Sequence, residues 1–245
     1  MNEDELLKKR FAELDDRAYM KGFCTFSEFL NLDEISILKS TKLSKQPVLF
    51  GGHKGADRCV AGFGENVQEW DFSIVCIEIA PLQQKFADKL NHRDFLGALM
   101  NLGINRNTLG DIIVKDNVGY LFCLNTISQY IIENLTRIRH TSVSCKIVDD
   151  LPDFVNAEPE SEELLTSSLR VDTIVASLYK LSRNNVSELF SKEKVFINSR
   201  VVTKESVNLK ENDVVSVRGY GKFVFCNPLR QTKKGRCVVE IKVYK

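Results

Sequence analysis

The sequence predicts an α+β protein with three folded regions: a small N-terminal α/β domain over residues 1–71, a βαββαβ domain over 72–150 and a basic domain over 169–245. Three observations lead to this division. Apolar residues recur at helical spacing in some segments and as short β-branched runs in others. Charge is segregated along the chain. Residues 151–168 are acidic and contain two prolines, which predicts a solvated linker.

The charge distribution is more informative than the net charge of +1 on 245 residues. Residues 169–245 hold 16 Lys and Arg against 7 Asp and Glu, whereas the preceding residues hold 18 against 26. Residues 149–163 carry seven acidic side chains and no basic one. A basic region on an acidic body is expected when one module binds a polyanion such as RNA.

The cysteines and the apolar runs argue against several classes of protein. None of the seven cysteines forms a C-x-x-C pair, and their number is odd, so neither a zinc site nor a disulfide framework is expected. The sequence has no signal peptide and no apolar run long enough to cross a membrane. We expect a cytoplasmic monomer that needs no metal and no cofactor and binds no membrane.

The N-terminal region should contain an amphipathic helix over residues 1–22, a second helix over 27–39 and a strand over 47–50. A glycine-rich loop, 51–58, follows that strand. It lacks the G-K-[ST] ending of a phosphate loop, so we expect a turn with positive φ. Its clustered cations could still contact RNA backbone: His53, Lys54 and Arg58.

The middle region alternates strands and helices. Asn91 with Asp94, and Thr126 with Gln129, are predicted to form capping boxes that begin two helices. Asp116-Asn117 suits a hairpin turn, because both residues tolerate left-handed geometry. Strands are expected at 73–79, 111–114, 118–124 and 143–148, which gives the ferredoxin-like order shared with RNA-recognition motifs (RRM-like).

Two pairs of side chains in this region are further candidates for RNA contact. Tyr120 and Phe122 lie two residues apart on the predicted third strand and therefore share one face of the sheet. They could stack on bases or pack against the N-terminal domain. His92 and Arg93 are expected to be exposed at the start of the first helix.

The C-terminal region is predicted to contain two short helices followed by a small sheet. Val171, Ile174, Val175 and Leu178 form one apolar face, and Ser182 can cap the next helix. Strands are expected at 195–197 and 214–217, with a turn at 198–199, and a hairpin of 223–226 with 237–244 closes the domain.

Cations gather around these elements. Arg183 falls in the first turn of the second helix, where unpaired N–H groups already favour phosphate. The full set is Arg170, Arg183, Lys192, Lys194, Arg200, Lys204, Arg218 and Lys222. The tip of the last hairpin is either a further RNA contact or solvated protection of a sheet edge: Lys233, Lys234 and Arg236.

Four segments in order, LRVD at 169–172, LSR at 181–183, VFIN at 195–198 and NDVVSV at 212–217, resemble the S-four RNA-binding domain. One departure is Asn198-Ser199, where that family often has Asn-Gly. The resemblance implies an RNA-binding role for Arg170, Ser182, Arg183, Asn184, Lys192, Asn198, Arg200 and Lys204.

The run at 90–104 with LGDI at 109–112, and the ending GYGKF at 219–223 with TKKGR at 232–236, resemble the YlmH family of S-four-domain proteins. That resemblance implies a ribosome-associated protein without catalytic residues. Its implied partners are 23S rRNA, tRNA and large ribosomal subunits that still carry peptidyl-tRNA after stalled translation. The family is also linked to cell division.

Two alternatives from other classes remain open. S-four domains are often attached to pseudouridine synthases, so an RNA-modifying enzyme is one, although the sequence offers no nucleotide-binding motif and its body is acidic. The other is a cell-division adaptor that binds protein.

Overall fold

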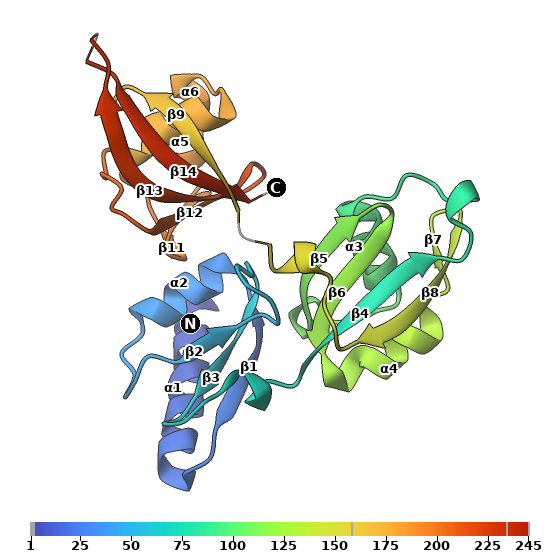
Figure 1. The fold of residues 1–245 in the computed structure, drawn as a ribbon. Helices are drawn as coiled ribbons and strands as arrows, with labels where there is room; N and C mark the ends of the chain where they lie inside the picture. Colours follow the sequence, from blue (N-terminus) through green and yellow to red (C-terminus); the bar gives the residue numbers. More distant parts are fainter. Residues whose placement is uncertain (1–2, 158, 234, 245) are drawn as a thin grey trace. The chain divides into compact units, whose positions relative to one another are not determined.

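The protein separates into two compact units, Met1–Ala157 and Glu158–Lys245, in a computed structural model that describes residues 3–157, 159–233 and 235–244 (Figure 1). Its sheets are built from antiparallel strand pairs and are covered by helices, which confirms the predicted α+β class. The division falls inside the segment that was predicted to be a linker.

The first part of unit 1 is a three-stranded sheet in the order β1-β3-β2, with its helices packed on it. The buried side chains of Phe11 and Ala18 confirm the predicted apolar face of the first helix. The elements are α1 (Glu3–Lys21), β1 (Thr25–Leu30), α2 (Leu32–Ser40), β2 (Val48–Phe50), β3 (Cys59–Phe63) and η1 (Glu69–Asp71).

The predicted helix over 27–39 is wrong in its first half. Residues 25–30 form β1, whose side chains alternate between buried and partly buried positions as far as Phe29. The helix begins only after Asn31, whose side chain accepts hydrogen bonds from the amides of Asp33 and Glu34. Glu34 in turn accepts from the Asn31 amide, so a complete capping box fixes this start.

The second part of unit 1 has a five-stranded sheet in the order β5-β6-β4-β8-β7. Its elements follow the predicted order, with the short β7 added. They are β4 (Ile74–Pro81), η2 (Gln84–Phe86), α3 (His92–Asn101), η3 (Arg106–Thr108), β5 (Leu109–Lys115), β6 (Val118–Leu124), α4 (Asn125–Asn134), β7 (Arg137–Ile138), β8 (Thr141–Val148) and η4 (Asp153–Val155).

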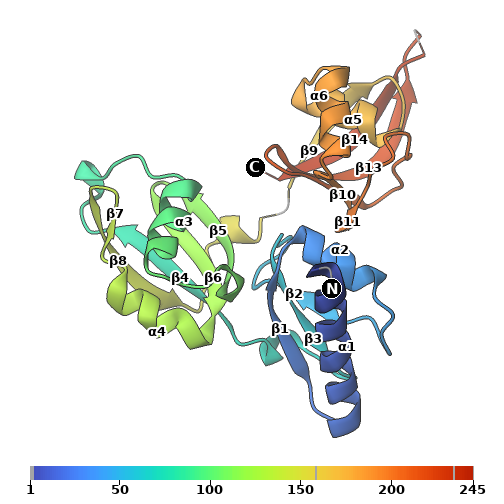
Figure 2. The same ribbon diagram turned by 180° about the vertical axis from the view of Figure 1, so that it is seen from behind.

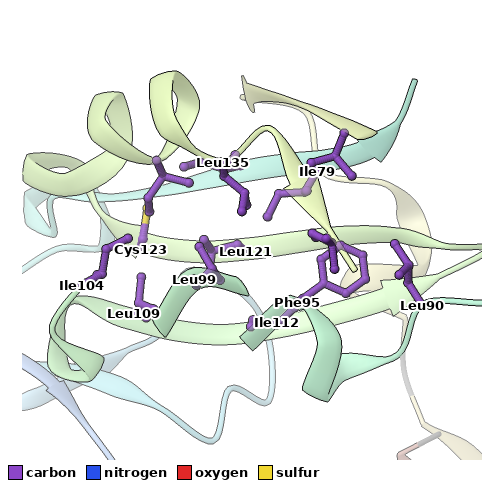
Figure 3. Close-up of a cluster of buried hydrophobic side chains, with 14 residues drawn as sticks. Ile79, Leu90, Phe95, Leu99, Ile104, Leu109, Ile112, Leu121, Cys123 and Leu135 are labelled. Atoms are coloured by element: carbon purple, nitrogen blue, oxygen red, sulfur yellow. The ribbon is translucent and has the colours of Figure 1, made fainter. Parts of the chain in front are cut away.

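The main core of this part lies between α3, α4 and one face of the sheet. Figure 3 shows Phe95 from α3 and Leu135, after α4, pointing toward strand residues such as Leu121. All three are at most 3% exposed. The predicted capping box of Asn91 and Asp94 is confirmed, as is the Asp116-Asn117 turn, where φ is 49° and 63°. The Thr126 box is wrong, because α4 begins at Asn125.

Unit 2 is a six-stranded sheet in the order β11-β10-β12-β13-β14-β9, with α5 and α6 on one face (Figures 1 and 2). The two predicted helices and the final hairpin are confirmed. The elements are β9 (Glu160–Thr166), α5 (Val171–Tyr179), α6 (Arg183–Ser191), β10 (Val195–Ile197), β11 (Arg200–Val201), β12 (Asp213–Val217), β13 (Gly221–Gln231) and β14 (Cys237–Tyr244).

The predicted acidic linker is wrong in both halves. In the first half η4 packs Val155, 5% exposed, into a core cluster of unit 1. Residues 160–166 form β9, an edge strand that pairs with β14 over its whole length. Leu164 packs against the core of unit 2, while Glu163 forms a two-fold hydrogen-bonded ion pair with Arg230 at 3.0 and 2.7 Å. Acidic side chains on an edge strand also discourage pairing with another chain.

Candidate nucleic-acid interface

Helix α6 presents the clearest exposed cationic surface of unit 2. Ser182 begins the helix, and its hydroxyl accepts a hydrogen bond from the Asn185 amide at 3.3 Å. Because Val186, Leu189 and Phe190 are buried, the opposite face of the helix is in solvent. Arg183 and Asn184 in the first turn, and Lys192 just after the last residue of the helix, are exposed.

The far end of α6 meets the ends of β10 and β12. Lys192 forms an ion pair with Glu188, one turn earlier on the helix. The backbone amide of Arg218 donates to the carbonyl of Lys194 at 2.9 Å, so these two cations are neighbours. The Arg218 guanidinium lies 5.2 Å from the centre of the Phe196 ring while the residue stays exposed. The structure therefore brings Lys192, Lys194 and Arg218 together.

Arg170 is less available than the sequence suggested. Its guanidinium donates two hydrogen bonds to Asp172, at 3.0 and 2.6 Å, and these bonds raise the pKa of Arg170. Glu205 adds a second acidic neighbour. An RNA phosphate would have to compete with Asp172. Lys204, next to Glu205 in the chain, is exposed.

The turn between β10 and β11 has a structural task. Asn198 and Ser199 both have positive φ, 52° and 61°. The side-chain Nδ2 of Asn198 donates to Asp213 Oδ1 at 2.8 Å, and its Oδ1 accepts from the Val214 backbone N–H at 2.9 Å, so this side chain already ties the turn to β12. This internal use argues against the predicted RNA contact at Asn198. Arg200, at the start of β11, is exposed.

Lys222 does not fit the predicted role, because it is only 9% exposed. It pairs with Tyr244 across the β13–β14 ladder, and its ammonium lies 5.1 Å from the centre of that ring. At the tip of the same hairpin Lys233 and Arg236 are exposed, whereas Lys234 lies outside the described residues.

Lys180, Lys210 and Arg230 are exposed cations of unit 2 that were not among the predicted RNA contacts. Lys180 ends α5 in a left-handed conformation, with φ at 53°, and is exposed two residues before the Ser182 cap. Its position in the turn between two amphipathic helices was the available signal, because residues in such turns face solvent.

The glycine-rich loop of unit 1 uses most of its polar groups internally. Asp111 on β5 accepts hydrogen bonds from the Asp57 and Arg58 amides, at 2.7 and 3.2 Å, and contacts His53 Nε2 at 3.2 Å. The His53 side chain is 7% exposed. This burial argues against the predicted RNA contact at His53, whereas Lys54 is exposed.

Arg58 is also a structural residue. Its guanidinium donates to the carbonyls of Phe29, Arg106 and Leu109, at 2.9–3.2 Å, and so joins the two sheets of unit 1. Burial lowers the pKa of Arg58 and lowers that of the neighbouring Arg106 to about 10. This use of its donors argues against the predicted RNA contact at Arg58.

The two candidate aromatic residues are buried. Tyr120 and Phe122 share a face of the sheet as predicted, but they are 8% and 1% exposed. Phe29 and Val60 from the first part of unit 1 pack in the same cluster. The alternative of packing against the N-terminal region is thus confirmed, and base stacking on these rings is excluded by their burial. His92 and Arg93 are exposed at the start of α3.

The described residues show neither a cluster of metal ligands nor a membrane-spanning helix. No group of three or more His, Cys, Asp or Glu side chains in the described ranges is placed to hold a metal ion. Within the same ranges, no helix combines the length and apolar character needed to span a membrane.

Comparison with known proteins places the chain in a family. Residues 67–150 match the model described as the putative RNA-binding domain in YlmH. A Bacillus subtilis (strain 168) relative named ribosome-associated protein quality control protein P2 is 30% identical over 194 residues, which are 76% of this chain and 73% of the relative. The chain belongs to the YlmH family. This confirms the predicted family, and the segment matched by the family model contains residues 90–112.

A solved structure of the same family name, cell division protein YlmH from Streptococcus pneumoniae, is 21% identical. Its TM-score is 0.49, and the alignment covers 62% of this chain and 93% of that chain. The segment matched by the family model runs from just before η1 to the end of β8 and contains the whole five-stranded sheet.

Proposed function

We propose that this chain is a non-catalytic RNA-binding protein that associates with the ribosome in translation quality control. The observation that carries the proposal is the exposed cationic surface of unit 2, formed by α6 and the ends of β10 and β12. Its family membership and the name of its Bacillus subtilis relative support the ribosome as the source of the RNA. We further propose a cytoplasmic monomer.

The proposal assigns a separate task to each part of the chain. Residues 169–245 act as an S-four RNA-binding domain, and residues 72–150 as a ferredoxin-like, RRM-like domain next to the N-terminal domain at 1–71. The strand order β5-β6-β4-β8 and the pair of helices on one face of its sheet support the second assignment. The specific ligands proposed are 23S rRNA and tRNA on large subunits that carry peptidyl-tRNA.

Binding would depend mainly on phosphate contacts. Arg183 and Lys192 lie at opposite ends of α6, with Lys194 and Arg218 adjacent to the second. A surface of this kind grips the RNA backbone and loses affinity steeply as salt rises, since bound cations release counterions from the RNA. Acidic β9 lies at the opposite edge of the sheet from β11.

Gradient sedimentation of the full chain with purified large subunits tests the proposal. The wild type should comigrate with them, and Arg183→Ala with Lys192→Ala should abolish most of the comigration at about 0.15 M salt. Lys42→Ala with Lys45→Ala is the matched control, because it removes the same charge from exposed positions of unit 1. Equal behaviour of the two double variants would contradict the site.

The alternatives give different results in the same preparations. Turnover in an assay for RNA modification would favour an enzyme related to pseudouridine synthases. Absence of any ribosome association, together with retention by division proteins, would favour a protein-binding adaptor.

A further inference from the structure

One end of the five-stranded sheet is assembled from three loops. The segment 82–91, between β4 and α3, is tied to the β5–β6 turn: Gln84 Nε2 donates to the Asp116 carbonyl at 2.6 Å, and the Leu90 amide donates to Asn117 Oδ1 at 3.0 Å. It is also tied to the β7–β8 turn, because the His140 amide donates to Asp88 Oδ2 at 3.1 Å. Figure 1 shows η2 and the β7–β8 turn together beyond the end of β4. We call this region the loop end.

The loop end carries a surplus of exposed positive charge. Two of the acidic side chains there serve the backbone: Asp88 accepts from the His140 amide, and Asp94 accepts from the Asn91 amide at 3.0 Å. Asp116 is an exposed carboxylate. Arg139 lies 3.6 Å from Asp94 and is still 54% exposed in its side chain. The exposed cations are Lys85, Lys89, Arg93, Arg137 and Arg139.

An exposed aromatic ring stands among these cations. Phe86 is 78% exposed and ends η2, and Leu82, four residues earlier in the chain, is 64% exposed. The Phe86 amide donates to the Gln83 carbonyl at 3.2 Å, so the backbone that presents the ring is fixed. The Lys85 ammonium lies 5.8 Å from the ring centre. An aromatic face flanked by cations suits an unstacked base with its neighbouring phosphates.

Trp70 shows that exposure alone does not create this arrangement. It is 80% exposed on η1 in the same unit, but its two chain neighbours are Glu69 and Asp71. A base stacked there would bring its phosphates toward carboxylates. Trp70 therefore provides a natural control for an exposed aromatic side chain without a cationic surround.

We propose that the loop end binds single-stranded RNA, with one base stacked on Phe86 and the adjoining phosphates held by Lys85, Lys89 and Arg139. The proposal rests on the proposed RNA-binding function and adds a second contact, separate from α6. It also assigns base stacking to a ring other than Tyr120 or Phe122, which the first part of unit 1 covers.

The test measures binding of the full chain to a fluorescent 12-nucleotide oligouridylate over a range of KCl concentrations. Phe86→Ala should weaken binding about tenfold, a typical loss for one stacked base. Phe86→Tyr should retain the affinity, and Trp70→Ala should leave it unchanged. Lys85→Ala with Lys89→Ala should reduce the slope of log affinity against log salt by about 1.4.

The same series is repeated in the Arg183→Ala, Lys192→Ala background, which lowers binding through unit 2. If Phe86→Ala stays within twofold of its parent, or if Trp70→Ala causes an equal loss, the loop-end site is refuted while the large-subunit sedimentation result stands. If oligouridylate binding depends on Phe86 but large subunits are not bound at all, the proposed ribosomal function falls and the loop-end site remains.

A photocrosslinker, p-benzoylphenylalanine, placed at position 86 separates RNA from protein as the partner. With purified large subunits the account predicts crosslinks to rRNA nucleotides. Crosslinks to ribosomal proteins alone would overturn the proposal.

Discussion

Arg58 in unit 1 and Arg183 in unit 2 both lie in short cation-rich segments, but the structure uses them differently. Arg58 is enclosed by three backbone carbonyls from distant parts of the chain, and burial lowers its pKa. Arg183 stands exposed at the first position of α6. The comparison teaches that clustered charge in a sequence does not distinguish a structural cation from a ligand-binding one. Whether backbone carbonyls lie close enough to accept from the cation decides between these two roles.

The first prediction concerns Arg58 and has the largest expected effect. Arg58→Ala should lower the free energy of unfolding of unit 1 by about 3 kcal/mol, because it removes a shared donor from three carbonyls. Urea unfolding followed by circular dichroism measures this, with the exposed Arg10→Ala as control. If the Arg58→Ala variant had normal stability but weaker RNA binding, Arg58 would be an RNA contact and not a structural residue.

The second prediction concerns the opposite class of residue. Arg183→Ala with Lys192→Ala should reduce the slope of log affinity against log salt by about 2 for large-subunit rRNA, since two phosphate contacts are lost. The free energy of unfolding should stay within about 0.5 kcal/mol, as for most exposed positions. Filter binding at several KCl concentrations gives the slope. An unchanged slope would remove α6 from the interface.

The third prediction concerns Asn198. The family resemblance implies that it binds RNA, but its side chain is hydrogen-bonded within unit 2. Asn198→Ala should destabilise unit 2 by about 1.5 kcal/mol, because it loses two hydrogen bonds and puts alanine at positive φ. Asn198→Gly should recover the backbone part of the loss. Both variants should keep the wild-type salt slope once folded, and a reduced slope would count against a purely structural role.

The fourth and smallest effect is the pH dependence from the exposed Glu163–Arg230 pair on β9 and β13. Hydrogen bonding to Arg230 lowers the pKa of Glu163, so this pair stabilises the folded state above the ordinary carboxyl pKa. That contribution is lost as pH falls through the lowered pKa. Thermal melts between about pH 3 and pH 6 should show a slightly shallower acid loss for Glu163→Gln. An identical pH profile would mean that the pair adds nothing.

How much could be predicted from the sequence depended on how local the signal was. Helix α6, its Ser182 cap and the Asp116-Asn117 turn depend on neighbouring residues, and all three were predicted. Strand β9 was missed because its partner, β14, lies far along the chain and three of its own seven residues are glutamates. Arg58 was misassigned for the same reason, since its acceptors come from distant segments.

The residues of the candidate site also differ in whether local sequence could predict their exposure. The exposed cations Arg183 and Lys192 lie at the two ends of α6, which the Ser182 cap and the apolar spacing locate from the sequence. The burial of Lys222 against Tyr244, and of Phe122 against the first part of unit 1, depends on pairings that no local pattern reveals.

The most direct test of the central claim is a map of ultraviolet crosslinks between the full chain and rRNA on purified large subunits. The account predicts crosslinked peptides from α6 and from the residues around Lys194, Lys204 and Arg218, with none from residues 51–58 apart from those next to Lys54. Crosslinks confined to unit 1, with α6 unmodified, would contradict it.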